Sequence, residues 1–406
     1  MLPLTFFKRK TLSAVFLCVC LVLFSNDFLA FGFALINELP HLVLDIHLGD
    51  DEFDHQYQTA AISPQDNALW VAVRFHKVGD EQSWNYSLWK FNQKGEKIHE
   101  IPIDNLKDRP LGISSFMILG NGDMLFIADP IYSPSMIRMN KDGKILFVRQ
   151  LIRLGAQASI SKVVRTSDNN FLLLGSRSGD ALAINVDGMG EIIWEKTFDN
   201  GRQEFLVDGV SVQDGGVIAI GSSTIYQGKS FGASEILLLK LDKKGAIRVV
   251  NSFPGRLGPL PPGHTGCLMQ DKNGKYIIVY DKGTSSMNRD IWIKALNVDF
   301  NYLWEKAFLK LEHDAGMFKL VPVSTGGFIA VGSKNFFLSV SKFDIDGKII
   351  WDYLSDKTTK RRLAIFDLIS NNGKVFILRS VHSSNLQKQR NDKIGALSFL
   401  PNGLLK

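Results

Sequence analysis

A short segment with a tight turn recurs along the whole chain, and this repeat constrains the fold more than any other feature. Its clearest copies are INVDGMGEIIWEKT at 184–197 and KFDIDGKIIWDYL at 342–354. The turns are marked by Gly95, Gly143, Gly190, Gly245, Gly347 and Gly403, with Phe300 in one degenerate copy. Successive turns are roughly 50 residues apart, which indicates one array of seven similar structural units.

Each repeat carries a second turn upstream of the first, so that it holds four short strands. Two of these upstream turns are DNNF at 168–171 and TGGF at 325–328. Asn, Asp and Gly supply the positive-φ conformations of tight hairpins, and the short apolar runs that follow predict buried strands. Four-stranded units repeated radially form a β-propeller with one unit per blade. We therefore predict an all-β fold, a seven-bladed β-propeller of four-stranded antiparallel blades.

The two ends of the chain predict how the ring closes. The last repeat ends shortly after its turn, PNGLLK at 401–406, and lacks a fourth strand. LVLDIHL at 42–48 alternates apolar and polar residues and predicts a strand that belongs to no repeat. We expect this N-terminal strand to complete the last blade and close the ring, because closure removes free sheet edges.

The first 34 residues differ from the repeat region and predict export. Basic residues at 8–10 precede a run at 11–24 that is dominated by apolar residues. The run is short for a membrane span and typical of a signal peptide. We predict a signal peptide, or an uncleaved signal anchor, at 1–34 and a single β-propeller domain at 35–406. The protein is then periplasmic or secreted, and it meets a membrane only through the N-terminal segment if that segment is retained.

Cysteine content and charge exclude some classes of function. Of three cysteines only Cys267 lies outside the predicted signal peptide, so no intramolecular disulfide forms. We expect Cys267 to be a small buried hydrophobe rather than a nucleophile. The net charge of +6 is spread along the chain, and no nucleic-acid-binding motif is present, so we expect no nucleic-acid partner.

Three repeats carry a tryptophan at one fixed place after the turn. Asp346, Gly347 and Trp351 give the full pattern, and Trp194 and Trp304 hold the same place in two other repeats. This pattern resembles the tryptophan-docking repeats of pyrroloquinoline-quinone-type propellers, and GGFIAVGS at 326–333 resembles the repeat propellers of exported bacterial proteins. The resemblance implies the fold and no activity. Quinone dehydrogenases of that type have eight blades and vicinal cysteines, so we predict no cofactor and expect the tryptophans to pack between blades.

The connections between successive blades form the first candidate ligand site. Six of them carry a basic or titratable residue: Arg109, Arg153, Arg202, Arg256, His313 and Arg361. We expect these residues to form a cationic ring that binds an anionic group, because guanidinium groups suit carboxylate and phosphate. The alternative is that arginine is simply common in exposed connections.

The loops between the second and third strands of the blades form the second candidate site. They are the longest and most varied loops, and long loops on a rigid scaffold commonly carry function. Their expected anchors for a partner are Trp84, Tyr226, Phe231 and Met287. These loops and the blade connections share one face of a propeller, and we expect the tight turns of the other face to contribute little.

No motif predicts a catalytic or metal-binding residue. The acidic run at 49–55 is expected to be a solvated connection, with a calcium site as the alternative. We therefore expect a binding or scaffolding module for a protein, a glycan or a small anionic molecule, rather than an enzyme. The alternative is an enzyme or enzyme subunit that is similar in architecture to the heavy subunit of quinoprotein amine dehydrogenases.

Overall fold

The computed structural model describes most of the chain between residues 53 and 399. Within that range the undescribed residues are 78, 81–82, 93–94, 104–111, 130–133, 152–156, 228–229, 256, 258–266, 284–288, 310–318, 324–325, 335–336, 355–361, 372–373 and 383–392. The predicted signal peptide and the predicted strand at 42–48 lie outside the described residues. In the described part of the chain, no helix is long and apolar enough to cross a membrane.

The first three blades each contain four strands that pair in chain order. Blade 1 consists of β1 (Phe53–Ile62), β2 (Leu69–Lys77), β3 (Asn85–Phe91) and β4 (Lys97–Pro102). Blade 2 consists of β5 (Gly112–Ile118), β6 (Met124–Asp129), β7 (Ser135–Met139) and β8 (Ile145–Gln150). Blade 3 consists of β9 (Ala158–Arg165), β10 (Phe171–Arg177), β11 (Asp180–Val186) and β12 (Ile192–Phe198).

The next three blades repeat this arrangement. Blade 4 consists of β13 (Gln203–Ser211), β14 (Val217–Gln227), β15 (Ser230–Leu241) and β16 (Ile247–Pro254). Blade 5 consists of β17 (Leu268–Gln270), β18 (Tyr276–Gly283), β19 (Arg289–Leu296) and β20 (Tyr302–Leu309). Blade 6 consists of β21 (Lys319–Pro322), β22 (Phe328–Lys334), β23 (Phe337–Phe343) and β24 (Ile349–Leu354).

The prediction of seven four-stranded blades is wrong, because the described structure has six. The last repeat forms a sheet of only three strands, β25 (Arg362–Asn371), β26 (Lys374–His382) and β27 (Lys393–Phe399). Among the described residues, this sheet has no strand that corresponds to the outer strand of the six blades. The all-β class, the antiparallel pairing and the repeated four-stranded blade are confirmed.

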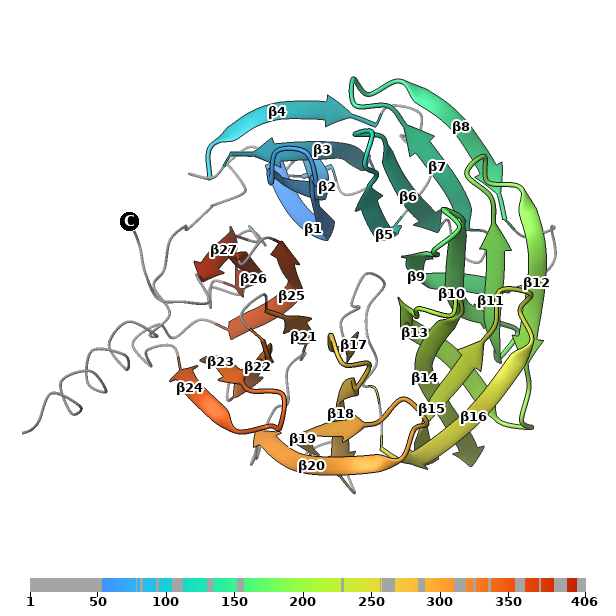
Figure 1. The fold of residues 1–406 in the computed structure, drawn as a ribbon. Coiled ribbons are helices and arrows are strands. Elements are labelled where there is room, and N and C mark those ends of the chain that lie inside the picture. Colours follow the sequence, from blue (N-terminus) through green and yellow to red (C-terminus); the bar gives the residue numbers. More distant parts are fainter. Residues whose placement is uncertain are drawn as a thin grey trace, which may run out of the picture.

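The sheets are arranged in a ring around a common axis, as Figure 1 shows. The first strand of each sheet lies innermost next to the first strand of the following sheet, and β25 lies next to β1. The last strand of each blade lies at the outer rim. We call the face with the blade connections and the loops between second and third strands the loop-bearing face. The opposite face is the turn face.

In the repeated turn, the side-chain oxygen of one Asp or Asn accepts hydrogen bonds from backbone N–H groups. In blade 4, Oδ1 of Asp242 accepts hydrogen bonds from the backbone N–H groups of Lys244 and Ala246, each at 2.9 Å. Gly245 follows in the left-handed region with φ of 77°. The same bonds recur at Asn140, Asp187, Asn297 and Asp344. Phe300 keeps the left-handed conformation with φ of 63°, so the degenerate copy retains the turn without glycine.

Tryptophan side chains on the outer strands pack against the following blade. The Trp194 ring of β12 lies on the turn of blade 4, where a Cβ atom on Gly245 would come within 2.7 Å of it. Its Nε1 also donates a hydrogen bond to the carbonyl oxygen of Lys243 at 3.0 Å. Trp304 lies on Gly347 of the following blade in the same way, at 2.8 Å from such a Cβ atom. Packing between blades, as predicted, is therefore confirmed for these two tryptophans.

Candidate functional site

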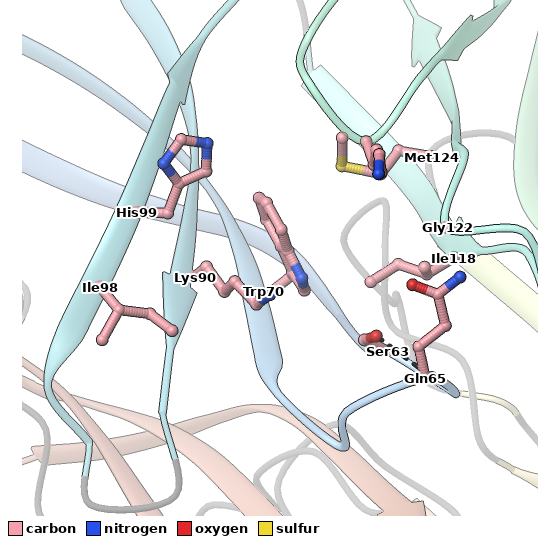
Figure 2. A pocket seen from close by; sticks show the side chains of 10 residues that line it. Ser63, Gln65, Trp70, Lys90, Ile98, His99, Ile118, Gly122 and Met124 are labelled. Atoms are coloured by element: carbon pink, nitrogen blue, oxygen red, sulfur yellow. Dashed lines mark hydrogen bonds between the residues drawn. The ribbon is translucent and has the colours of Figure 1, made fainter.

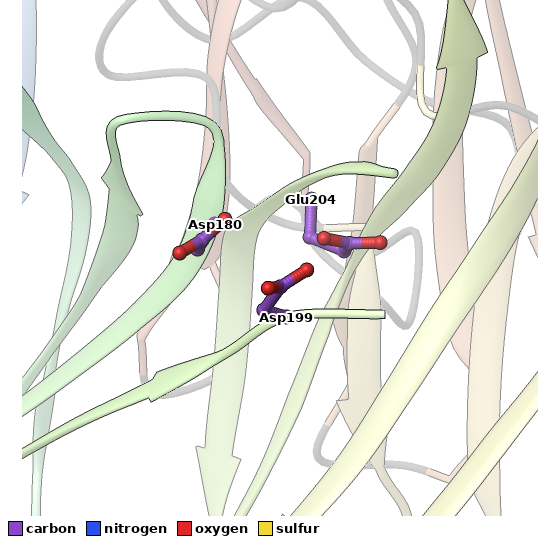
Figure 3. Close-up of side chains that lie close together, drawn as sticks. All are labelled: Asp180, Asp199 and Glu204. Carbon is purple, nitrogen blue, oxygen red and sulfur yellow. The ribbon is translucent and has the colours of Figure 1, made fainter. Parts of the chain in front are cut away.

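Three carboxylates converge on the loop-bearing face at the junction of blades 3 and 4. Asp180 begins β11, Asp199 lies in the connection that follows β12, and Glu204 is the second residue of β13. One oxygen of each carboxylate lies within 4.8 Å of the others. Figure 3 shows the three groups facing one another across the junction. We call these three residues the acidic cluster.

Backbone geometry brings the acidic cluster together. Ser178 and Gly179 both have positive φ, at 53° and 97°, which gives the tight hairpin turn between β10 and β11. The carbonyl oxygen of Gly179 accepts a hydrogen bond from the backbone N–H of Glu204 at 2.7 Å. This bond joins the inner strand of blade 4 to the turn of blade 3. It therefore holds the start of β11 beside the start of β13.

Glu204 is the buried member of the acidic cluster. Its side chain is 1% exposed, and its Oε1 accepts a hydrogen bond from the Ser223 hydroxyl at 3.0 Å. Its Oε2 is buried and has no hydrogen-bond partner. Burial raises the pKa of Glu204, and the nearby Asp199 and Asp180 charges raise it further. The three like charges repel one another, so the ionised cluster costs stability unless a proton or a cation offsets the repulsion.

Arg202 is the one member of the predicted cationic ring that the structure describes. Its Nη1 lies 3.0 Å from Oε2 of Glu235, an ion-pair contact on the loop-bearing face that lacks hydrogen-bond geometry. Arg109, Arg153, Arg256, His313 and Arg361 lie outside the described residues. The cationic ring therefore stays a prediction, and at Arg202 the neighbouring groups are acidic.

Trp84 is the one predicted partner anchor whose side chain is described. It lies half-buried just before β3, at the edge of the loop that follows β2. The Arg74 guanidinium lies over its ring, 4.4 Å from the centroid. The buried His76 ring meets it edge-on, with the ring centroids 4.3 Å apart. Trp84 is thus held in one orientation; it also packs against the hydrophobic core of blades 1 and 2, and part of its surface remains exposed.

The structure describes the other predicted anchors only in part. Tyr226 and Phe231 face each other as backbone partners in the β14–β15 hairpin, which extends the loop-bearing side of blade 4. Met287 lies outside the described residues, and so does most of the acidic run at 49–55. Cys267 is 3% exposed, and burial raises the pKa of its thiol well above the usual range, so the prediction of a small buried hydrophobe is confirmed.

A pocket of about 360 Å³ lies between blades 1 and 2 on the turn face, where we expected little. Figure 2 shows Trp70 at its centre, with His99 and Lys90 on one side and Met124 and Gln65 on the other. His99 holds the strand position that Trp194 holds in blade 3, since each lies opposite the same point of the third strand. The imidazole is smaller than an indole, and the cavity beside Trp194 measures only about 10 Å³.

Comparison with known proteins identifies the fold and nothing finer. No family model matches the chain, and no curated protein matches it. Among solved structures, it is similar to a catalytically inactive variant of virginiamycin B lyase from Staphylococcus aureus in complex with quinupristin. The two share 11% identity with a TM-score of 0.53, over 87% of this chain and 98% of the lyase.

A second similar structure has a different description. It is the WD40 domain of coronin from Toxoplasma gondii, at 9% identity and a TM-score of 0.52, over 88% of each chain. A lyase and a WD40 domain therefore match about equally well. At this level of identity the likeness shows a β-propeller of repeated blades and no function.

Sequence reasoning missed the acidic cluster and the turn-face pocket. Asp180 and Glu204 belong to different repeats, so their proximity depends on how blades 3 and 4 are aligned. The sequence signal for the cluster was an acidic residue at each of three places on the same face of the propeller: the start of β11, the connection after β12 and the start of β13. For the pocket, the signal was the replacement of tryptophan by His99 in the repeat.

Proposed function

We propose that this protein is an exported binding module, periplasmic or secreted, that holds a protein partner on its loop-bearing face. The single observation that carries the proposal is the fixed orientation of Trp84 between Arg74 and His76. Tryptophan and arginine are enriched among the residues that dominate binding energy at protein interfaces. An indole that is already ordered loses little conformational freedom when a partner covers it.

Export is supported by the sequence of the first 34 residues and by the resemblance of the repeats to those of exported propellers. A protein partner is favoured over an anionic small molecule at blades 3 and 4, because Arg202 is paired there and three carboxylates lie beside it. A membrane contact is expected only through the N-terminal segment, if it is retained.

Native mass spectrometry of the protein, purified gently from its own compartment, tests this function. We expect a stoichiometric protein mass bound to a chain that begins near residue 35. Trp84→Ala should lose that partner, while Tyr302→Ala should keep it, because Tyr302 is a 64% exposed aromatic on the outer strand β20.

Three other results would contradict the proposal. A bound oligosaccharide or anionic molecule that Trp84→Ala releases would replace the protein partner with that ligand. A bound quinone chromophore would favour the enzyme-subunit alternative. A clean mass of the unbound chain would exclude a partner that survives purification.

A further inference from the structure

We propose that Asp180, Asp199 and Glu204 bind a calcium ion at the junction of blades 3 and 4. This inference goes beyond the proposed function, because the site lies two blades from Trp84 and its ligand is an ion. The ion would link blade 3 to blade 4 on the loop-bearing face. On the turn face, the two blades are joined by the contact of Trp194 with the turn of blade 4.

The first argument is the buried oxygen of Glu204. This side chain is 1% exposed, yet its Oε2 has no hydrogen-bond donor. A buried carboxylate oxygen without a partner is uncommon in native proteins and calls for a ligand, an ordered water or an ion. Figure 3 shows the three carboxylates gathered at one point of the junction, with one oxygen of each within 4.8 Å of the others. A cation satisfies all three groups at once.

The second argument is the absence of a protein cation for this cluster. Arg177, the last residue of β10, forms an ion pair with Glu195 of β12. Arg202, in the connection beside Asp199, forms an ion pair with Glu235. None of the ion pairs among the described side chains includes Asp180, Asp199 or Glu204. The ion-pair contacts of both arginines near the cluster are therefore with other glutamates.

The donor set and its spacing indicate calcium. All three donors are carboxylate oxygens, which hard cations prefer over the nitrogen and sulfur ligands typical of zinc. The three oxygens lie within 4.8 Å of one another, so only a small inward rotation of the side chains separates them from a shared calcium ion at about 2.4 Å from each. Magnesium requires about 2.0–2.1 Å and a stricter octahedral geometry. The exposed Asp199 leaves the site open to solvent, so water can complete the coordination shell.

The test is calcium binding by the full mature chain after treatment with a chelator. We expect calorimetric titration with CaCl₂ to give one site per chain, with a dissociation constant on the order of 10⁻⁴–10⁻³ M, as in extracellular modules. At about 5 mM calcium the Tm should rise by roughly 2–4 °C, because the ion binds only the folded chain. The same concentration of magnesium should give a smaller shift.

Two substitutions and one control locate the ion. Glu204→Gln should raise the Tm of the calcium-free protein, because it removes a buried like charge, and it should abolish the calcium shift. Asp199→Asn should weaken the calcium shift. Because Asp199 is exposed, this variant still tests the site if the buried Glu204→Gln variant misfolds. Asp142→Asn should keep the full shift, because Asp142 is an exposed carboxylate on the turn face of blade 2.

Each opposite result overturns the proposal. No heat and no Tm shift in the native chain would exclude the site. An equal shift with magnesium would overturn the assignment to calcium. A full calcium shift in both Glu204→Gln and Asp199→Asn would place the ion elsewhere.

Discussion

Single glycines decide how closely neighbouring blades approach. Gly245 combines φ of 77° with a position where an added Cβ would lie 2.7 Å from the Trp194 ring. Gly326 has a similar conformation, with φ of 92°, but an added Cβ there would meet nothing within 4 Å. Substitutions at the two positions therefore distinguish the cost of backbone strain, which both share, from the cost of a steric clash between blades, which arises only at Gly245.

Gly245→Ala should destabilise the protein more than Gly326→Ala. Both variants place alanine in the left-handed region, which costs about 1 kcal/mol. Only Gly245→Ala also displaces Trp194, and such overpacking adds roughly 1–3 kcal/mol. Denaturant unfolding of the two variants measures the difference. Equal free energies of unfolding would show that the tryptophan contact tolerates the methyl group without cost.

At the scale of the element, the hairpin turn is stabilised by a carboxylate or an amide at one position. Asp242 illustrates this, and its Oδ2 also accepts a hydrogen bond from Nε of Arg248 at 2.7 Å and lies 2.6 Å from Nη2 of the same side chain. The backbone N–H of Ala246, and with it Arg248, holds the pKa of Asp242 below its usual value. Asn140 and Asn297 make the same turn bonds without a charge.

Asp242→Asn should make the stability of the protein less dependent on pH. The pKa of Asp242 is lower in the folded than in the unfolded chain, so the ionised group stabilises the fold above the unfolded value of 3.8. This stabilisation is lost as the pH falls through the folded value. The Tm advantage of the native chain over Asp242→Asn should therefore shrink between pH 5 and about pH 2. A constant difference across that range would mean that the charge does not contribute.

These turns were predictable from sequence because their bonds are local. Asp242 and Gly245 are three residues apart, and an Asp or Asn stands three residues before the turn glycine, or before Phe300, in six of the seven copies, so position and type of turn follow from short segments. The pairing of Arg202 with Glu235 could not be predicted in this way. It depends on the alignment of β15 with the preceding connection, which no spacing within one repeat encodes.

At the scale of the whole molecule, the three-stranded sheet stands between the last and first blades. β25 lies next to both β21 and β1, so the ring is continuous only through it. The sequence predicted seven four-stranded blades, but the described part of the last repeat forms a sheet of three strands, so six such blades are present. The acidic cluster was also unpredictable at this scale, because it exists only where two blades meet.

Removal of this sheet should open the ring. A chain that ends at residue 361 lacks β25–β27 and exposes the sides of β21 and β1 that β25 contacts. We expect loss of the soluble monomer in size-exclusion chromatography, together with a Tm at least several degrees lower. A chain that lacks only residues 1–34 is the control and should remain monomeric. A monomeric truncated chain with an unchanged Tm would show that the six blades are stable as an open arc.

The outer strands at the rim affect how the protein behaves in concentrated solution. Each lies at the end of its sheet, and apolar side chains such as Ile193 and Val250 are about half exposed there. Strand edges of this kind pair readily with edges of other molecules and start fibre growth. In β12 the charged Glu195 and Lys196 follow Ile193 closely, and in β20 Glu305 and Lys306 hold the matching places. These charged pairs act as gatekeepers against edge-to-edge pairing of β12 and β20 with other molecules.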